Sequence, residues 1–339
     1  MRRCKHSAVI EHLSSTQSSL ADSLRLQRLI DQLPDGDAQR PLVLACIGTT
    51  EKQVAVEQLL LADKVTACKT HPSLCNAFLD SSTKDSDHPI ILLDIDVTSG
   101  PAVHHAQSLC HQFRPLPAQS AEVAESVRLQ LVRDVFLPFS DVVCIFADDF
   151  GGLSSVLRFI RSCEDVPGPK ASSPLNTRFI VVSSSKDGSS SADLDEADFL
   201  DDARKLEQLQ MLGSISVEYV LGTGSKGARY AALRRRLADH ELEAARAERL
   251  IGMRLFCGTH LASLFSQCLE HTVSDSVAEF DVFLASRRGV STLPNLADCL
   301  TAVLHTLEGP PHGALVTVIA TSLLMDAYPR SSHRECPQS

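Results

Sequence analysis

Apolar runs alternate with longer amphipathic segments through the middle of the chain. Three uninterrupted apolar runs stand out: Leu42–Ile47, Val142–Ala147 and Phe179–Val182. A fourth run, Ile90–Ile95, is apolar except for Asp94 near its end, and each of the four is followed by a polar or glycine-containing turn. A weaker run covers Ile215–Leu221. Uninterrupted runs of this kind are typical of parallel strands that are buried on both faces.

The segments between these runs have the apolar spacing of helices. They cover Glu51–Leu61, Ala121–Val135, Leu153–Cys163 and a long stretch from Gly227 to Arg246. A short strand over Lys64–Lys69 is also consistent with the pattern. Because strands that alternate with helices form βαβ units, the pattern predicts an α/β fold with a mostly parallel sheet and helices on both faces.

The two ends of the chain have a different pattern. The polar first segment is helix-prone, with an apolar stripe from Leu24 to Leu33 that ends at Pro34-Asp35-Gly36. After about residue 243 the apolar runs typical of strands stop, and three segments have helical spacing: Ala244–Leu269, Asn295–Leu307 and Ala314–Ala327. The predicted division is a lead-in (1–40), an α/β domain (41–242), an all-helical C-terminal extension (243–330) and a disordered tail (331–339).

Composition narrows the class of protein. The 32 Lys and Arg against 42 Asp and Glu give a net charge of −10, and the chain has no Trp. This balance argues against a nucleic-acid partner, which requires a basic face. The most apolar segment, Ala314–Met325, is shorter than the roughly 18–20 residues that span a bilayer, so we expect no membrane span. Eleven scattered cysteines without a Cys-x-x-Cys pair predict a reducing, cytoplasmic environment and no metal site.

The turn after the first strong strand carries the candidate chemistry. A strand, a glycine-containing turn, a helix and a strand ending in Asp follow one another in P-loop domains, whose GxxxxGK[ST] loop holds phosphate and Mg²⁺. In register from Gly48, the second glycine, the lysine and the hydroxyl are replaced by Gln53, Val54 and Ala55. The turn is therefore degenerate, and its remaining candidates for nucleotide binding are Gly48, Thr49, Thr50 and Lys52, the last of which lies two residues too early.

Acidic residues at the end of the second strong strand extend this pattern. Asp94 and Asp96 lie where a P-loop protein places the carboxylate on the Mg²⁺ side. Open α/β sheets bind ligands at the carboxyl ends of their strands, which predicts a cleft near Gly48, Asp94, Asp149 and Ser183. The Asp148–Gly152 segment itself is most simply a strand-to-helix turn with an acid near the helix N-terminus.

Four stretches of the chain resemble a group of large multidomain fungal proteins. The stretches are Ser140–Gly152, Thr177–Val182, Leu255–Ala262 and Val318–Pro329. In those proteins a degenerate P-loop GTPase-like region and a helical segment precede a cysteine-rich zinc module and a patatin-like lipid acyl hydrolase domain. The resemblance implies a shortened relative or a free-standing copy of the front half. The patatin signature is absent, so the resemblance assigns no catalytic residue.

These observations favour a non-catalytic regulatory or accessory protein with a protein partner. Its affinity for GTP or ATP with Mg²⁺ is expected to be weak or absent, because the residues that contact phosphate and metal are replaced. One alternative is a divergent NTPase that uses Lys52 with Asp94 or Asp96 at the metal. A third hypothesis is an interaction scaffold for a separately encoded enzyme. The sequence leaves the oligomeric state open.

Overall fold

The computed structural model describes residues 7–14, 18–59, 73–97, 114–115, 124–165, 177–184, 196–207, 214–220, 226–251 and 255–273, together with Phe280 and Ala285. The chain divides into two compact units, Met1–Glu279 and Phe280–Ser339, and the elements described below belong to the first. The predicted strand at 64–69, the predicted helices at 295–307 and 314–327 and the predicted tail lie outside the described residues.

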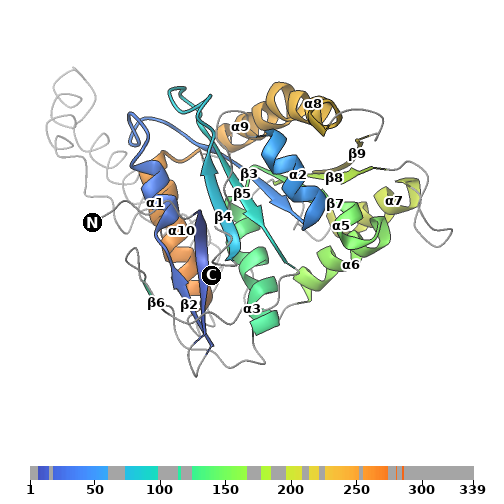
Figure 1. The fold of residues 1–339 in the computed structure, drawn as a ribbon, viewed down its shortest axis with the longest axis horizontal. Helices are drawn as coiled ribbons and strands as arrows, with labels where there is room; N and C mark the ends of the chain where they lie inside the picture. The colour runs from blue at the N-terminus through green and yellow to red at the C-terminus, as the bar shows by residue number, and fades with distance from the viewer. Residues whose placement is uncertain are drawn as a thin grey trace, which may run out of the picture. The chain divides into compact units, whose positions relative to one another are not determined.

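Nine strands of the described chain form one sheet (Figure 1). They are β1 (Ala8–Ser14), β2 (Ser18–Asp22), β3 (Leu42–Ile47), β4 (Ser73–Leu79), β5 (Ile90–Ile95), β6 (Arg114–Pro115), β7 (Val142–Phe146), β8 (Arg178–Ser183) and β9 (Ser214–Tyr219). Their order across the sheet is β6-β2-β1-β4-β5-β3-β7-β8-β9.

The helices are α1 (Arg25–Ile30), α2 (Thr50–Leu59), α3 (Ala124–Leu131), α4 (Leu137–Phe139), α5 (Ala147–Phe150), α6 (Leu153–Glu164), α7 (Glu196–Glu207), α8 (Lys226–Arg236), α9 (Leu242–Ile251) and α10 (Gly258–Val273). A π-helical segment, Val132–Phe136, joins α3 to α4, and a second, Leu237–Glu241, joins α8 to α9. None of the described helices is both long and apolar enough to cross a membrane.

The α/β class is confirmed, but the sheet is mixed. Strands β5, β3, β7, β8 and β9 are parallel to one another, as the uninterrupted apolar runs predict. The other half is antiparallel, since β4 runs against β5, β1 against β4, and β2 against both β1 and β6. Strand β4 alternates between buried and half-buried positions, so it has no uninterrupted apolar run that would have revealed it.

The lead-in differs from its prediction. The sequence predicts a polar, helix-prone segment over residues 1–40, and the structure has α1 within it, where the apolar stripe lies. It also has two strands there, β1 and β2, which extend the sheet beyond β4. The segment is therefore part of the α/β unit rather than an appendage.

The central strands are buried on both faces. Every residue of β3 and of β7 is buried. One face, which carries Leu44, Cys46 and Cys144, packs against apolar side chains of α2, α8 and α9. Figure 1 shows α2 on the viewer's side of the sheet and α3 on the far side. Helices therefore cover both faces of the sheet, as the sequence predicts.

Ion pairs tie the helices after residue 226 to the sheet. Arg178 of β8 pairs with Glu241 at 2.9 Å and with Glu248 at 2.8 Å.

Helices α8 and α9 run continuously through the second π-helical segment, so the predicted boundary at 242/243 falls inside helical structure. The compact unit extends through α10 to Glu279.

A second link joins α9 to the start of the central strands. Asp141, directly before β7, accepts a hydrogen bond from the Val43 N–H at 2.6 Å. Its other oxygen lies 2.5 Å from Nε of Arg249 in α9. Burial raises the pKa of the Asp141 carboxyl, and the Arg249 charge opposes that rise. Since both side chains are nearly inaccessible, neither could lose the other without leaving a charge buried.

Replacing Asp141 by Ala should destabilise the unit strongly. The change removes the counter-charge of Arg249 and the acceptor of the Val43 N–H, and breaking a buried pair costs about 3–5 kcal/mol. A urea titration should therefore show a fall of that size in the free energy of unfolding. Glu243→Ala breaks the exposed pair with Arg246 and should leave the midpoint unchanged. Equal effects of the two substitutions would contradict this role of Asp141.

Candidate functional site

The site lies at the carboxyl ends of the parallel strands, where open α/β sheets place their ligands. Strand β3 ends at Ile47, and α2 begins at Thr50 after two intervening residues. Between them Gly48 has a φ of +154°, a backbone conformation that residues other than glycine rarely adopt. Its N–H donates to the Ile95 carbonyl at 3.3 Å, which ties the turn to the end of β5.

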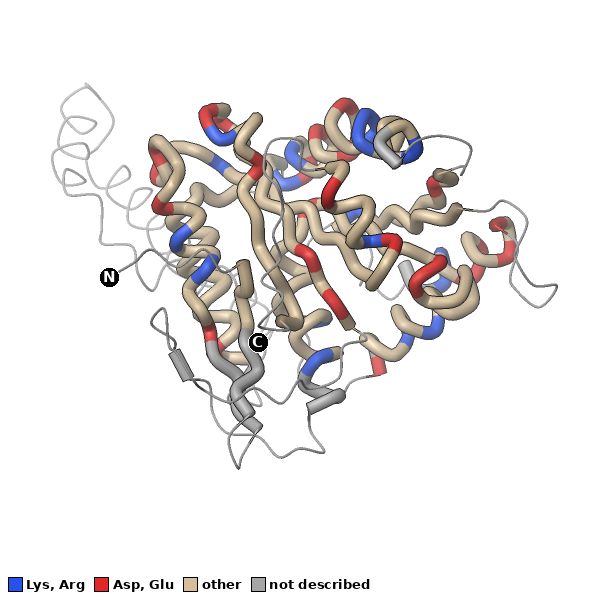
Figure 2. The backbone as a smooth tube through the Cα atoms, viewed as in Figure 1, with Lys and Arg blue, Asp and Glu red and all other residues tan. Residues whose placement is uncertain are grey.

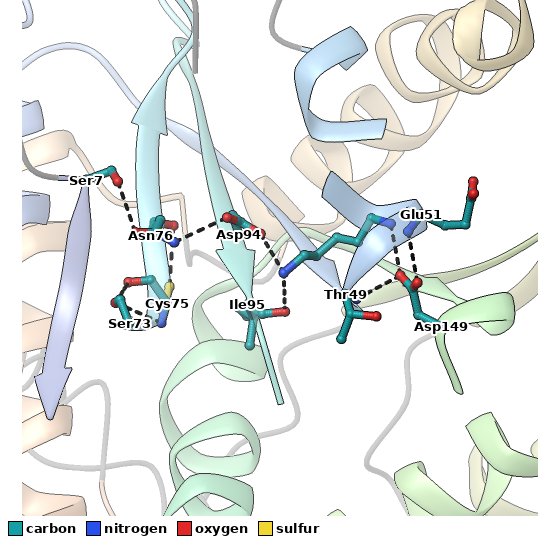
Figure 3. Close-up of polar contacts among 10 residues, drawn as sticks. Ser7, Thr49, Glu51, Ser73, Cys75, Asn76, Asp94, Ile95 and Asp149 are labelled. Atoms are coloured by element: carbon teal, nitrogen blue, oxygen red, sulfur yellow. Dashed lines mark hydrogen bonds and ion pairs between the residues drawn. The ribbon is translucent and has the colours of Figure 1, made fainter. Parts of the chain in front are cut away.

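Lys52 and Asp94, two of the residues that the sequence singles out, meet directly. The Lys52 Nζ lies 2.7 Å from Oδ1 of Asp94 and donates a hydrogen bond to the Ile95 carbonyl at 3.0 Å (Figure 3). Lys52 is only 4% exposed. The contact arises because β3 and β5 are neighbours with Cys46 opposite Asp94, so the first turn of α2 stands over the end of β5. The buried lysine is thus held by a carboxylate of the adjacent strand.

A chain of polar contacts continues from Asp94 across two more strands. The Asn76 side-chain amide in β4 donates to Oδ2 of Asp94 at 3.2 Å, and Ser7 Oγ donates to Oδ1 of Asn76 at 2.9 Å (Figure 3). Both carboxylate oxygens of Asp94 therefore have polar partners. The sequence analysis misses Asn76 and Ser7, because it does not predict β4 or β1.

The main-chain amides of the turn also have an acceptor. Asp149, in the four-residue helix α5 after β7, accepts hydrogen bonds from three of them. Its Oδ2 accepts from the N–H groups of Thr49 at 2.7 Å and Lys52 at 2.9 Å, and its Oδ1 accepts from Glu51 at 2.8 Å. Amides at a helix N-terminus attract anions through their partial positive charge. Here a carboxylate of the chain itself is that anion (Figure 3).

The neighbouring acid makes a similar contact with the next strand. Asp148 accepts a hydrogen bond from the Ser184 N–H, directly after β8, at 3.0 Å. Helix α5 therefore links the ends of β3 and β8 through two successive carboxylates. Gly48, Asp94 and Asp149 lie at one end of the sheet, and Ser183 ends the adjoining β8. The cleft predicted near them stays a prediction.

The side chain of Glu51 points away from the turn and fixes α2 against α8. It accepts a hydrogen bond from the Tyr230 hydroxyl at 2.8 Å and pairs with Arg229. The Arg229 guanidinium also lies 5.1 Å from the centre of the Tyr230 ring. Burial raises the pKa of the Tyr230 hydroxyl. No motif in the sequence identifies this cluster.

Thr50 and Asp96, two further residues that the sequence predicts for the site, also lie at this end of the sheet. Thr50 begins α2 with an exposed side chain. Asp96 follows β5, and its N–H donates to the Leu74 carbonyl in β4 at 2.9 Å. Within the described ranges, no three His, Cys, Asp or Glu residues are grouped as metal ligands would be.

The cysteines beside the site are buried thiols. Cys46 of β3 and Cys144 of β7 are opposite each other in the sheet and fully inaccessible. A hydrogen bond with Cys144, and then burial, raise the pKa of Cys46 well above its usual value. Burial likewise raises the pKa of Cys75. Because only the thiolate is a good nucleophile, these residues are not suited to covalent catalysis.

Comparisons of the chain with models of known protein families and with curated protein sequences find no match.

The buried pair should be visible in a double-mutant cycle. Lys52→Met leaves the Asp94 charge without its partner, and Asp94→Asn leaves the Lys52 ammonium without one, so each should cost about 3–5 kcal/mol of unfolding free energy. The combined variant should be at least ~1 kcal/mol more stable than the sum predicts, because contacting residues are not additive. Lys205→Met, at an exposed pair in α7, is the control without an effect. Additive losses in urea titrations would show that the two charges are not coupled.

Gly48 should tolerate a side chain poorly because Asp149 lies so close. An alanine Cβ there would lie 2.5 Å from Oδ2 of Asp149 and 3.1 Å from Cβ of Lys52. Gly151→Ala is the matched control, since Gly151 also has a positive φ, of +85°, but its nearest neighbour would be 4.0 Å away. We expect Gly48→Ala to lose more stability than the about 1–2 kcal/mol of backbone strain in Gly151→Ala. The excess should shrink when Asp149 is also Ala, and an unchanged excess would contradict the crowding.

Proposed function

We propose that the chain is a non-catalytic regulatory or accessory protein whose α/β unit is a degenerate P-loop GTPase-like domain that acts without nucleotide. The carrying observation is the pairing of Lys52 with Asp94 at 2.7 Å. In a P-loop domain the lysine of the loop neutralises phosphate, and the carboxylate at the end of the neighbouring strand lies on the Mg²⁺ side. Here the two charges neutralise each other.

The strand arrangement supports the comparison with GTPase domains. When the two-residue strand β6, which lies at the far edge of the sheet, is left out of the count, β3 is the first strand and β9 the sixth. The order β4-β5-β3-β7-β8-β9 is then two-three-one-four-five-six, and within it only β4 is antiparallel to its neighbour. GTPase domains share this order, with the phosphate-binding turn after the first strand. The glycine turn after β3 and the acid at the end of β5 are two of the parts of such a site.

The proposed relatives are the fungal proteins whose degenerate GTPase-like region precedes a patatin-like domain. One of the matching stretches, Ser140–Gly152, forms β7 and α5 and so includes Asp149. The free, mostly buried cysteines of the described chain are consistent with a reducing environment, and we propose a cytoplasmic protein that acts on a protein partner.

A divergent NTPase is the competing proposal, because Lys52 and Asp94 do meet at the expected end of the sheet. Such an enzyme would have to separate the pair and move Asp149 from the turn before phosphate could reach the amides. The first change would leave the buried Lys52 charge without its partner, and the second would leave three partly buried amides without their acceptor. Each has a cost in free energy. The closed arrangement therefore favours the non-catalytic protein.

Nucleotide should leave the stability of the protein unchanged. We expect GTP or ATP at about 1 mM with Mg²⁺ to shift the melting temperature by less than ~1 °C, whereas a ligand at 100 times its dissociation constant stabilises by about 2.7 kcal/mol. Phosphate release should not differ between the wild type and Lys52→Ala. A nucleotide-dependent stabilisation, with phosphate release that Lys52→Ala and Asp94→Ala abolish, would instead establish the NTPase.

A further inference from the structure

We propose that the Asp149 carboxylate takes the place of a phosphate group in the turn after β3, so that the chain closes this site with an anion of its own. The comparison with phosphate rests on the proposed function, since it takes the turn to be a degenerate P-loop. The contacts themselves do not depend on that comparison.

The geometry of the turn matches what a bound anion requires. Three amides from the first turn of α2 and the residue before it converge on the two oxygens of one carboxylate, at 2.7 to 2.9 Å. Hydrogen bonds to an ionised acceptor are shorter and stronger than neutral ones. Gly48 makes the approach possible, because a Cβ at that position would lie 2.5 Å from Oδ2 of Asp149.

The carboxylate comes from a distant part of the chain. Asp149 is 97 to 100 residues away from the amides that it accepts from, and it belongs to the turn after the neighbouring strand β7. An ordinary helix cap is supplied by the residue that begins the same helix. Asp149 instead joins two strand-to-helix turns, as a bound phosphate would join the loops around it.

Two features would keep a phosphate out of the wild-type site. The Asp149 charge occupies the amides and repels a second anion. The Lys52 ammonium, which could attract one, is turned toward Asp94 and the Ile95 carbonyl. Removing the Asp149 carboxylate should therefore free three amide donors beside Gly48, where the carboxylate stood, without disturbing the Lys52 pair.

The test compares Asp149→Ala with wild type and with Asp148→Ala in the full chain. Asp148 is the matched control, because it is the neighbouring acid of α5 and accepts one main-chain hydrogen bond, from Ser184. Melting temperatures are measured with increasing inorganic phosphate against chloride of equal ionic strength. We expect Asp149→Ala to melt ~5 °C or more below wild type and to recover at least half of that loss in phosphate. Wild type and Asp148→Ala should not respond to phosphate.

A second measurement applies if Asp149→Ala does not fold. Asp149→Asn keeps the size of the side chain but removes the charge, and amide hydrogen exchange reports directly on the donors of Thr49, Glu51 and Lys52. These three amides should exchange at least tenfold faster in Asp149→Asn than in wild type, while the amide of Ser184 should be unchanged.

The outcomes separate the two proposals. A phosphate response in wild type as large as in Asp149→Ala, no response in Asp149→Ala, or equal amide exchange in wild type and Asp149→Asn would each overturn the role of Asp149. Stabilisation of wild type by nucleotide would contradict the proposed function alone. The proposed role of Asp149 would still hold in that case if nucleotide stabilised Asp149→Ala more than it stabilised wild type.

Discussion

A lysine ammonium buried at the end of a parallel sheet determines much of the arrangement around it. Lys52 is almost inaccessible, and an unpaired charge in that position would be prohibitively unstable. Strand β5 provides Asp94 as the counter-charge, and Asn76 of β4 donates a hydrogen bond to the second oxygen of that carboxylate. Ser7 in turn donates a hydrogen bond to the Asn76 side-chain oxygen. The antiparallel strand β4 thus contributes a hydrogen-bond donor to the polar contacts at the end of β5.

The central strand β3 is held by ionic contacts at both of its ends. At its beginning, the Val43 N–H donates to Asp141, which is paired with Arg249. At its other end, the turn is held by Asp149, and the helix that follows is held by the Lys52–Asp94 pair. Figure 2 shows acidic and basic positions along the α/β unit. The Lys52–Asp94 and Arg249–Asp141 pairs differ from the exposed ones because their side chains are buried. Each of the charges named here has an opposite charge or several amide donors beside it, which offsets the cost of removing it from water.

The parallel half of the fold can be predicted from sequence because burial on both faces produces uninterrupted apolar runs. Strands β3 and β5 begin and end where their runs do. The antiparallel half cannot be found in this way, since β4 alternates between buried and half-buried residues and β1 lies in a polar segment. The meeting of Lys52 and Asp94 is within reach of sequence analysis, because Lys52 follows β3 and Asp94 lies near the end of β5, two apolar runs that are expected to be parallel. The role of Asp149 is not, because an acid in a strand-to-helix turn already has a local explanation in its own helix.

The position of Asp149 changes what the degenerate turn means for the domain. In a nucleotide-binding protein the loops at this end of the sheet are ordered by a ligand, and the entropy lost in ordering them is offset only when the ligand is bound. Here the same amides are satisfied within the chain, by a carboxylate that also ties the turn after β3 to the turn after β7. The ordering is then a property of the fold and does not depend on ligand concentration. Under the proposed function, Gln53 and Val54 stand where a P-loop has its second glycine and its lysine. This is consistent with an internal anion, because a turn that holds one needs neither a mobile cation nor a second close backbone approach. The surface at this end of the sheet is therefore expected to keep one conformation, which suits a partner-binding module better than a switch.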